Sequence, residues 1–209
     1  MLIDYETYPL SRRELRFFTK VIRKKLNIKS SKFPVIEMLD VLEEREGVLL
    51  SIEPDEEFDD KVVAYLTTES NGTYIIHIRN TVYDTACEGN KTSIGFICHE
   101  MCHYFLIAWF GYTPIYGRTL GTKKIDRFRS MEWQAKALCG ELMIPYEDFL
   151  LASIQEIMDK TDSSFSQARY YVDVVRDSDD ALIKAIEVGK VIPDSRLSCL
   201  ENLDKKEER

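Results

Sequence analysis

The sequence predicts an α+β fold, in which helices and a small sheet are built from separate stretches of the chain. Two amphipathic helical patterns come first, at residues 11–26 and 34–47. Runs rich in β-branched residues follow between residues 48 and 79. Helical patterns then fill most of the chain from residue 91 onward. This order of helices, sheet and more helices is typical of the α+β class.

Composition favours a folded protein with one main core. The chain has 209 residues, of which 44% are apolar, so global disorder is not expected. We predict a domain over residues 1–150 and a C-terminal helical extension over residues 151–209 packed on it. The net charge of −8 argues against a sequence-independent nucleic-acid binder, which needs an excess of Lys and Arg.

A reducing, cytoplasmic location is expected from two features. The N-terminal residues lack the basic and apolar segments of a signal peptide, and no apolar run is long enough to cross a bilayer. The five cysteines are an odd number without the spacing of a small disulfide scaffold. Free thiols are therefore expected.

The first two helices have clear start and stop signals. Ser11 and Glu14 form a capping-box pattern, flanked by a possible hydrophobic staple of Leu10 and Leu15. Pro34 suits the first turn of the second helix, which we expect to end at Gly47.

The first helix also has a basic face, for which two interpretations stay open. One is a solvated surface, and the other is a docking surface for an acidic partner or nucleic acid. The residues concerned are Arg12, Arg13, Arg16, Lys20, Arg23, Lys24, Lys25, Lys29 and Lys32.

Three strands are expected in the middle of the chain. They cover residues 48–52, 61–67 and 73–79, with an acidic loop over residues 53–60. Asn71 and Gly72 lie between the second and third runs and predict a β-hairpin. His77 falls within the third strand, where a single histidine is more often structural than a metal ligand.

Further helices are predicted downstream. An apolar helix covers residues 91–109, and an irregular loop covers residues 111–127. The next helix covers residues 130–144 and is stopped by Pro145. Residues 146–160, 164–177 and 179–188 are helical by pattern, and residues 201–209 form a charged, frayed tail.

The most informative motif lies in the helix over residues 91–109. It reads His99-Glu100-Met101-Cys102-His103, in a chain with three histidines in all. Residues i and i+4 lie on one helix face, so two imidazoles at this spacing can bind one zinc ion. The sequence therefore predicts a Zn²⁺ site held by His99 and His103.

A catalytic zinc site usually has a third protein ligand and one open position for water. Glu132 is the best candidate, because it shares a helix face with the apolar Ala135 and Leu142 and because a metal would offset the cost of burying its carboxylate. Glu100 lies about 100° further round the helix than His99 and can serve as general base for a zinc-activated water.

Cys98 and Cys102 leave two further possibilities for the same segment. They can belong to a structural Cys/His zinc site, although four ligands from one helical turn do not converge on one tetrahedral ion. The segment also has some likeness to a haem attachment signal, but three residues rather than two separate the cysteines. Their favoured role is as small buried packing residues.

The motif, together with the later run from Glu132 to Pro145, resembles the ImmA/IrrE family of zinc metallo-endopeptidases. The run Glu132-Trp133-Gln134-Ala135 opens the second helix of that pattern, and Glu141-Leu142-Met143-Ile144-Pro145 closes it. The segment Tyr83-Asp84-Thr85-Ala86 before the motif is similar as well. The resemblance implies a zincin-like core, zinc ligands at His99, His103 and Glu132, and a catalytic base at Glu100.

Three positions depart from the family pattern. Cys102 stands where glycine is common, Lys136 where asparagine is common, and Ile144 where leucine or methionine is usual. None of these residues is a predicted ligand, so the departures bear on packing, rate and regulation rather than on the chemistry.

The expected function is a zinc endopeptidase that cleaves a specific protein. The resemblance implies a helix-turn-helix repressor as substrate, whose cleavage induces genes of a mobile element or of a stress response. Transition-state help is expected from Tyr112, Tyr116 or Arg118. One alternative is a non-catalytic regulator that binds a repressor or antitoxin. The other is DNA binding by residues 164–171, which the nearby aspartates disfavour.

Overall fold

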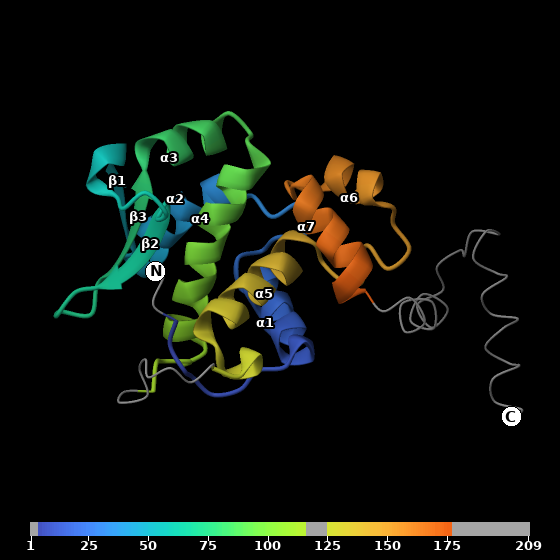
Figure 1. The fold of residues 1–209 in the computed structure, drawn as a ribbon, viewed down its shortest axis with the longest axis horizontal. Helices are drawn as coiled ribbons and strands as arrows, with labels where there is room; N and C mark the ends of the chain where they lie inside the picture. The colour runs from blue at the N-terminus through green and yellow to red at the C-terminus, as the bar shows by residue number, and fades with distance from the viewer. Residues whose placement is uncertain (1–3, 116–124, 177–209) are drawn as a thin grey trace, which may run out of the picture.

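The order of elements agrees with the predicted α+β class. A computed structural model describes residues 4–115 and 125–176 (Figure 1). The helices are α1 (Arg12–Lys25), α2 (Val35–Glu46), α3 (Asn80–Cys87), α4 (Lys91–Tyr104), α5 (Met131–Met143), α6 (Ile154–Lys160) and α7 (Phe165–Tyr170). The strands are β1 (Leu49–Glu53), β2 (Ala64–Thr68) and β3 (Tyr74–Arg79). Short 3₁₀ or π turns are η1 (Asp55–Glu57), η2 (Phe105–Trp109), η3 (Arg127–Arg129) and η4 (Tyr171–Val175).

The sheet is mixed and has the order β1-β3-β2. β1 runs parallel to β3, and β2 runs antiparallel to it, with Leu50 and Leu66 both opposite Ile76. The predicted Asn-Gly hairpin joins β2 to β3, and Gly72 adopts a positive φ of 88° there. Glycine adopts a positive φ without steric strain because it has no Cβ, which explains its place in this turn. Among the described strands, β2 lies at an edge of the sheet.

The helices are stacked against the sheet in layers, which Figure 1 shows from the side. α4 contacts β2 and β3 on one side and α5 on the other, and α5 in turn packs against α1. The layers meet through fully buried apolar side chains, including Ile76, Ile97, Met101 and Leu138. α4 is therefore central and is covered on opposite sides by the sheet and α5.

Side chains cap the helices at the predicted starts. Ser11 and Glu14 make the complete capping box of α1, and Asn90 accepts two backbone hydrogen bonds at the start of α4. At α5, the Ser130 hydroxyl accepts from the Trp133 backbone N–H at 2.9 Å. These contacts satisfy N–H groups that have no partner within the helix.

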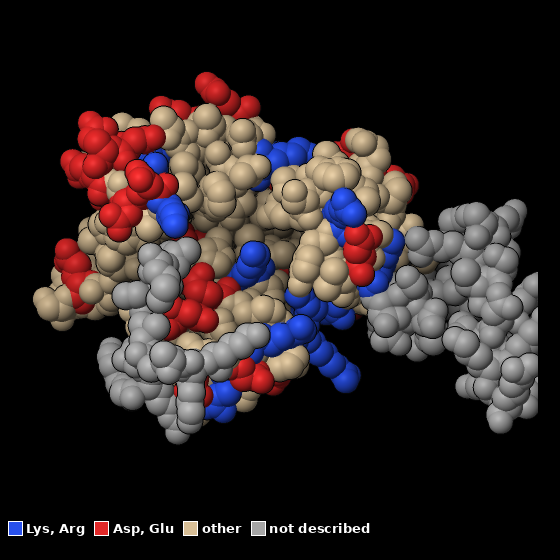
Figure 2. Space-filling view, viewed as in Figure 1, with Lys and Arg blue, Asp and Glu red and all other residues tan. Residues whose placement is uncertain are grey.

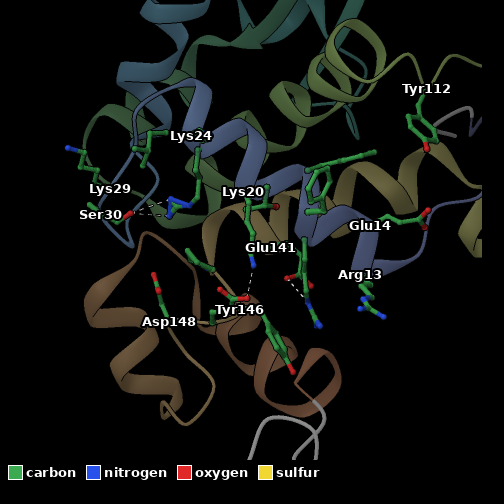
Figure 3. A pocket seen from close by; sticks show the side chains of 18 residues that line it. Arg13, Glu14, Lys20, Lys24, Lys29, Ser30, Tyr112, Glu141, Tyr146 and Asp148 are labelled. Atoms are coloured by element: carbon green, nitrogen blue, oxygen red, sulfur yellow. Dashed lines mark hydrogen bonds and ion pairs between the residues drawn. The ribbon is translucent and has the colours of Figure 1, made fainter. Parts of the chain in front are cut away.

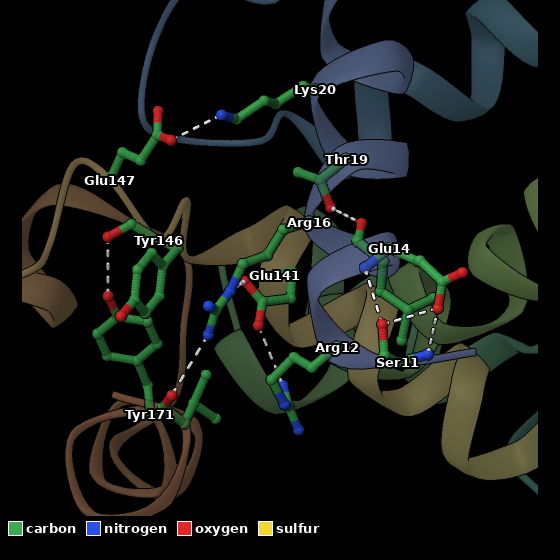
Figure 4. Close-up of polar contacts among 12 residues, drawn as sticks. Ser11, Arg12, Glu14, Arg16, Thr19, Lys20, Glu141, Tyr146, Glu147 and Tyr171 are labelled. Carbon is green, nitrogen blue, oxygen red and sulfur yellow. Dashed lines mark hydrogen bonds and ion pairs between the residues drawn. The ribbon is translucent and has the colours of Figure 1, made fainter. Parts of the chain in front are cut away.

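One interpretation of the basic face of α1 was a solvated surface. The structure shows that this is wrong for Arg12 and Arg16, whose side chains are mostly buried. Arg12 and Arg16 both bind the carboxylate of Glu141 on α5, at 3.2 and 3.1 Å (Figure 4). The Glu141 side chain is only 1% exposed, and burial raises its pKa while Arg16 and Arg12 lower it in part. The guanidinium of Arg16 also lies 3.4 Å above the ring centre of Tyr146.

Other basic residues of α1 make peripheral contacts. Lys20 pairs with Glu147 at 2.6 Å, and Arg23 donates to the carbonyl oxygens of Ser30 and Ser31. Beside them lies a hollow of about 1510 Å³ between α1 and the turn after α5 (Figure 3). Residues of both charges line this hollow, with Lys20 and Lys24 on one side of the balance and Glu147 and Asp148 on the other.

Three predicted elements need correction. Residues 80–87 form helix α3, which was not predicted. The Asp55 carboxylate accepts hydrogen bonds from the backbone N–H and the hydroxyl of Thr81, at the start of α3. Asp55 is distant in the chain, so local sequence did not reveal this contact. Residues 146–152 are turns, and helix α6 begins only after a capping box at Ser153. The second strand starts at residue 64 instead of 61, because a turn brings Val62 N–H to the Asp59 carbonyl at 2.9 Å.

The predicted helix over residues 164–177 divides into α7 and the π turn η4. The predictions for residues 179–188 and 201–209 lie outside the described residues. Ile157, Ala168 and Tyr171 are buried in the same apolar core as Leu15 and Leu138. The C-terminal helices thus share the main core, and the boundary at residues 150 and 151 stays a prediction.

The surface has an acidic area over the β1 end of the sheet (Figure 2). It comes from the loop after β1, where η1 consists of Asp55, Glu56 and Glu57. In the described parts of the chain, every helix is too short or too polar to span a lipid bilayer.

Candidate metal centre

Helix α4 carries both histidines of the motif on the face turned toward α5. Their imidazole Nε2 atoms lie 3.1 Å apart, and the two rings are nearly perpendicular, at 86°. His103 is 11% exposed at its side chain and His99 is 21% exposed. One helical turn separates the residues, so helix geometry puts them on one face, and their side-chain conformations bring the two nitrogens together.

Helix α5 brings Glu132 to the same point. Its carboxylate oxygens lie 3.3 Å from His99 Nε2 and 3.2 Å from His103 Nε2. Glu132 is in the first turn of α5, where a negative charge is stabilised by the helix dipole. The predicted ligands His99, His103 and Glu132 are thereby brought together from two helices.

Asp4 holds the beginning of α5, a role that the sequence did not indicate. Its carboxylate accepts hydrogen bonds from the Glu132 backbone N–H at 3.1 Å and from the Ser130 hydroxyl at 2.7 Å. Neighbouring backbone bonds tie the same N-terminal segment to this region, from Thr7 to Arg129 and from Met131 to Tyr5. The contact links residues more than 120 positions apart, so no local pattern reveals it.

The spacing of the three donors fits a tetrahedral zinc ion. With Zn–N distances of about 2.0–2.1 Å, two nitrogen ligands of such an ion stand about 3.3 Å apart. The three donor separations here are 3.1, 3.2 and 3.3 Å. Two imidazoles and one carboxylate are also a ligand set that catalytic zinc accepts, with the fourth position left for water.

Glu132 is ionised in this arrangement. Burial by itself raises the pKa of its carboxyl, but hydrogen bonds and charge from His103 and His99 outweigh burial and hold the pKa well below its usual value. The site therefore presents a full negative charge beside two imidazole nitrogens, which suits a divalent cation.

Glu100 behaves differently from Glu132, although both side chains line the same cleft. Burial raises the pKa of Glu100 to about 7, helped by the nearby Glu132 charge and opposed by His99 and by a hydrogen bond from the Leu66 backbone. A carboxyl whose pKa is near neutrality can accept and release a proton. A bound cation would favour its ionised form and lower that pKa.

The donors lie in a cleft of about 1360 Å³. Its walls come from β2, α4, α5 and the C-terminal helices, and include Leu66, Phe96, Trp133 and Tyr170. Figure 2 shows the molecule hollowed between the sheet and α7. The cleft is larger than the roughly 300–1,000 Å³ of small-molecule pockets and is mainly apolar, so it has room for a segment of polypeptide.

The third histidine does not take part in the centre. His77 Nδ1 bonds Glu53, its Nε2 lies 2.8 Å from the Thr67 hydroxyl, and its ring stacks on Tyr65 with centres 4.4 Å apart. These contacts join the three strands across the sheet. His77 is thus structural here, as its position in a strand predicted.

A second cluster of donors lies between the same two helices. Cys98 and Cys102 on α4 meet Cys139 on α5, with the three sulfur atoms within 4.8 Å of one another. All three are buried, at 0%, 0% and 4% exposure. Burial raises the pKa of the Cys102 thiol, and hydrogen bonds with Cys139 and Cys98 raise it further. The two motif cysteines group with each other and Cys139, separately from the histidine group.

Of the three residues predicted to assist the transition state, the structure describes Tyr112, which lies away from the cleft. Tyr112 lines the hollow beside α1 instead, with its ring 5.7 Å from that of Phe18. Tyr116 and Arg118 lie outside the described residues.

Comparisons with known proteins add no relative. No protein-family model, no curated protein and no solved structure matches this chain.

Proposed function

We propose that this chain is a zinc-dependent endopeptidase of the ImmA/IrrE type, with a zincin-like core. The single observation that carries the proposal is the spacing of the His99, His103 and Glu132 donors, which match three corners of a zinc tetrahedron. The resemblance of the motif and of the later Glu132–Pro145 run supports the same conclusion.

The chain's own groups supply the parts of a hydrolytic reaction. His99, His103 and Glu132 would hold the ion, and zinc, when bound, supplies a Lewis acid that polarises the scissile carbonyl and acidifies water. Glu100 takes the proton from the attacking water and passes it to the leaving amine. Burial raises the pKa of Glu100, and a bound cation would lower it again, which favours the ionised carboxylate that accepts the first proton.

The edge strand supports a peptide as substrate. β2 pairs with β3 on one side, and its residues Ala64, Tyr65 and Leu66 also line the cleft. An extended peptide can add to a free strand edge through main-chain hydrogen bonds. A peptide bound along β2 would lie in the cleft that His99 and His103 also line, with its side chains against the apolar walls.

The resemblance names the preferred substrate class as a helix-turn-helix repressor, whose cleavage would induce mobile-element or stress genes. A non-catalytic regulator that only binds such a repressor uses the same fold. The two functions differ in their need for Glu100, because binding does not require a general base.

The test uses wild type and Glu100→Gln, each expressed in its host cells at equal levels. Protein N-termini are then labelled and identified by mass spectrometry. We expect new N-termini in one or a few proteins with wild type and a loss of about 10²–10⁴-fold in their rate of appearance with the variant. Zinc analysis of both purified proteins is the control, with about one ion per chain expected in each. Equal cleavage by the variant would remove Glu100 from the mechanism, and unchanged regulation without cleavage would favour the binding function.

A further inference from the structure

The buried sulfur cluster between α4 and α5 has more members than its three cysteines. The thiol of Cys139 points at the thioether sulfur of Met143, one turn further along α5, at 3.8 Å. Met143 is 1% exposed. The three cysteine sulfurs therefore form one group in the core, and the Met143 sulfur joins it through its contact with Cys139.

We propose that these four residues form a second metal site, specific for a soft monovalent ion such as copper(I). Thiolate and thioether sulfur are soft ligands that suit copper(I). Zinc sites are instead built from Cys, His and carboxylate ligands, without a methionine. The proposal does not rest on the endopeptidase function, since none of the four residues belongs to the histidine centre.

The spacing of the sulfurs is close to that of a metal site. With a metal–sulfur distance of about 2.3 Å, ligating sulfurs stand about 3.8 Å apart in a tetrahedron and about 4.0 Å apart in a trigonal plane. The cysteine sulfurs here lie within 4.8 Å of one another, and Cys139 lies 3.8 Å from Met143.

The surroundings favour a soft ion and exclude water. Each cysteine has an apolar neighbour in the chain that is fully buried. These neighbours are Ile97, Met101 and Leu138, on the same two helices. Polar contacts at the cluster include one from the Cys139 thiol to the Gly95 carbonyl at 3.7 Å. A site built from sulfur and lined by apolar side chains suits a soft ion, because soft ions prefer sulfur to oxygen ligands.

An entry path leads from the large cleft. Cys139 and Met143 both line that cleft, while Cys98 and Cys102 lie behind them. Gln167 from α7 donates to the Met143 sulfur at 3.5 Å and lies over Gly95, where an added Cβ would come within 3.0 Å of it. Movement of the Gln167 side chain would expose the two outer sulfurs to an incoming ion.

The main test measures copper(I) affinity of the zinc-loaded protein without oxygen, in competition with a colorimetric copper(I) chelator. Cys87 is exposed and Cys199 lies outside the described residues, so both are first replaced by serine. We expect one copper(I) per chain in that background. Cys139→Ser should weaken binding more than a hundredfold, because even partners outside the ligand set contribute about 10- to 100-fold.

Three further tests address the case in which the Cys139→Ser variant misfolds. X-ray absorption of the copper-loaded background protein should show sulfur ligands without nitrogen. Copper(I) should also slow alkylation of Cys98, Cys102 and Cys139 in wild type, while Cys87 reacts at its former rate. Met143→Leu, which keeps the volume, should weaken copper(I) binding about tenfold or more.

Several results would overturn the proposal. One is unchanged affinity in Cys139→Ser, and another is nitrogen coordination, which would move the ion to the histidines. A third is zinc filling the cluster so that copper(I) does not displace it. Loss of all binding in the double serine background would place the ion on the replaced cysteines.

Discussion

The histidine cluster and the cysteine cluster lie between the same two helices, yet they differ in exposure. Each takes two residues from α4 at i and i+4 and a third from α5. The histidine centre opens to the cleft, with Glu132 34% exposed, whereas Cys98 and Cys102 are fully buried. Positions 98 and 102 are one residue before 99 and 103, so a rotation of about 100° separates a substrate-facing site from a core site.

This difference shows how one helix pair can provide two chemical environments. The open centre combines harder ligands with access for water, as hydrolysis requires. The closed cluster combines soft ligands with dry packing. The largest expected effect therefore comes from removing a ligand of the open centre.

His103→Ala should reduce bound zinc from about one ion per chain to nearly none after dialysis, because one imidazole and one carboxylate hold zinc poorly. Cys139→Ser is the matched variant on the closed cluster and should keep its zinc. Metal analysis of both purified proteins measures the effect. Loss of zinc from Cys139→Ser alone would mean that the two clusters have been assigned the wrong roles.

Arg16→Met tests whether α5 is held by its contact with α1 independently of metal. The change leaves the buried Glu141 with one arginine, so we expect a loss of about 1–3 kcal/mol in the free energy of unfolding. Urea unfolding of the metal-free proteins measures it. Arg13→Met, at an exposed position of the same helix, is the control and should stay within about 0.5 kcal/mol of wild type. Equal effects of the two changes would contradict a structural role for the Glu141 ion pairs.

The variant Cys98→Ser tests whether the cysteine cluster is part of the buried core. A hydroxyl buried in place of a thiol should cost about 1–3 kcal/mol, since burial without good partners is unfavourable. Cys87→Ser, at an exposed position, should change stability by less than about 0.5 kcal/mol. Thermal unfolding in reducing buffer compares them, and a neutral Cys98→Ser would show that the cluster is open to water.

The smallest effect concerns the third histidine, which neither cluster uses. His77 and Ser51 hydrogen bonds hold the pKa of Glu53 below its usual value. A pKa that is lower in the folded state stabilises the fold above the unfolded pKa, and this contribution is lost as the pH falls through the folded pKa. Between about pH 6 and pH 3, the melting temperature of wild type should therefore fall slightly more than that of Glu53→Gln. Glu56→Gln, at an exposed position nearby, should follow wild type, and parallel curves for all three proteins would exclude the effect.

Local patterns predicted the elements whose signals are complete within a few residues. The capping box of α1, the Asn-Gly hairpin and the Ser130 start of α5 are examples, because each is made by neighbours in the chain. Helix α3 escaped prediction, since Asp55 from another segment binds its first turn. The turns at residues 146–152 escaped for a related reason, because Tyr146 and Phe149 pack into the core from an irregular backbone.

The sequence by itself determined that the two imidazoles share a helix face, because residues i and i+4 lie one turn apart. It also indicated Glu132 through its place on an apolar helix face. Only the tertiary structure decided that Asp4 holds the start of α5, that Arg12 and Arg16 neutralise Glu141, and that Cys139 joins the motif cysteines. Each of these contacts joins segments distant in the chain, and helix packing, rather than local geometry, sets which side chains meet.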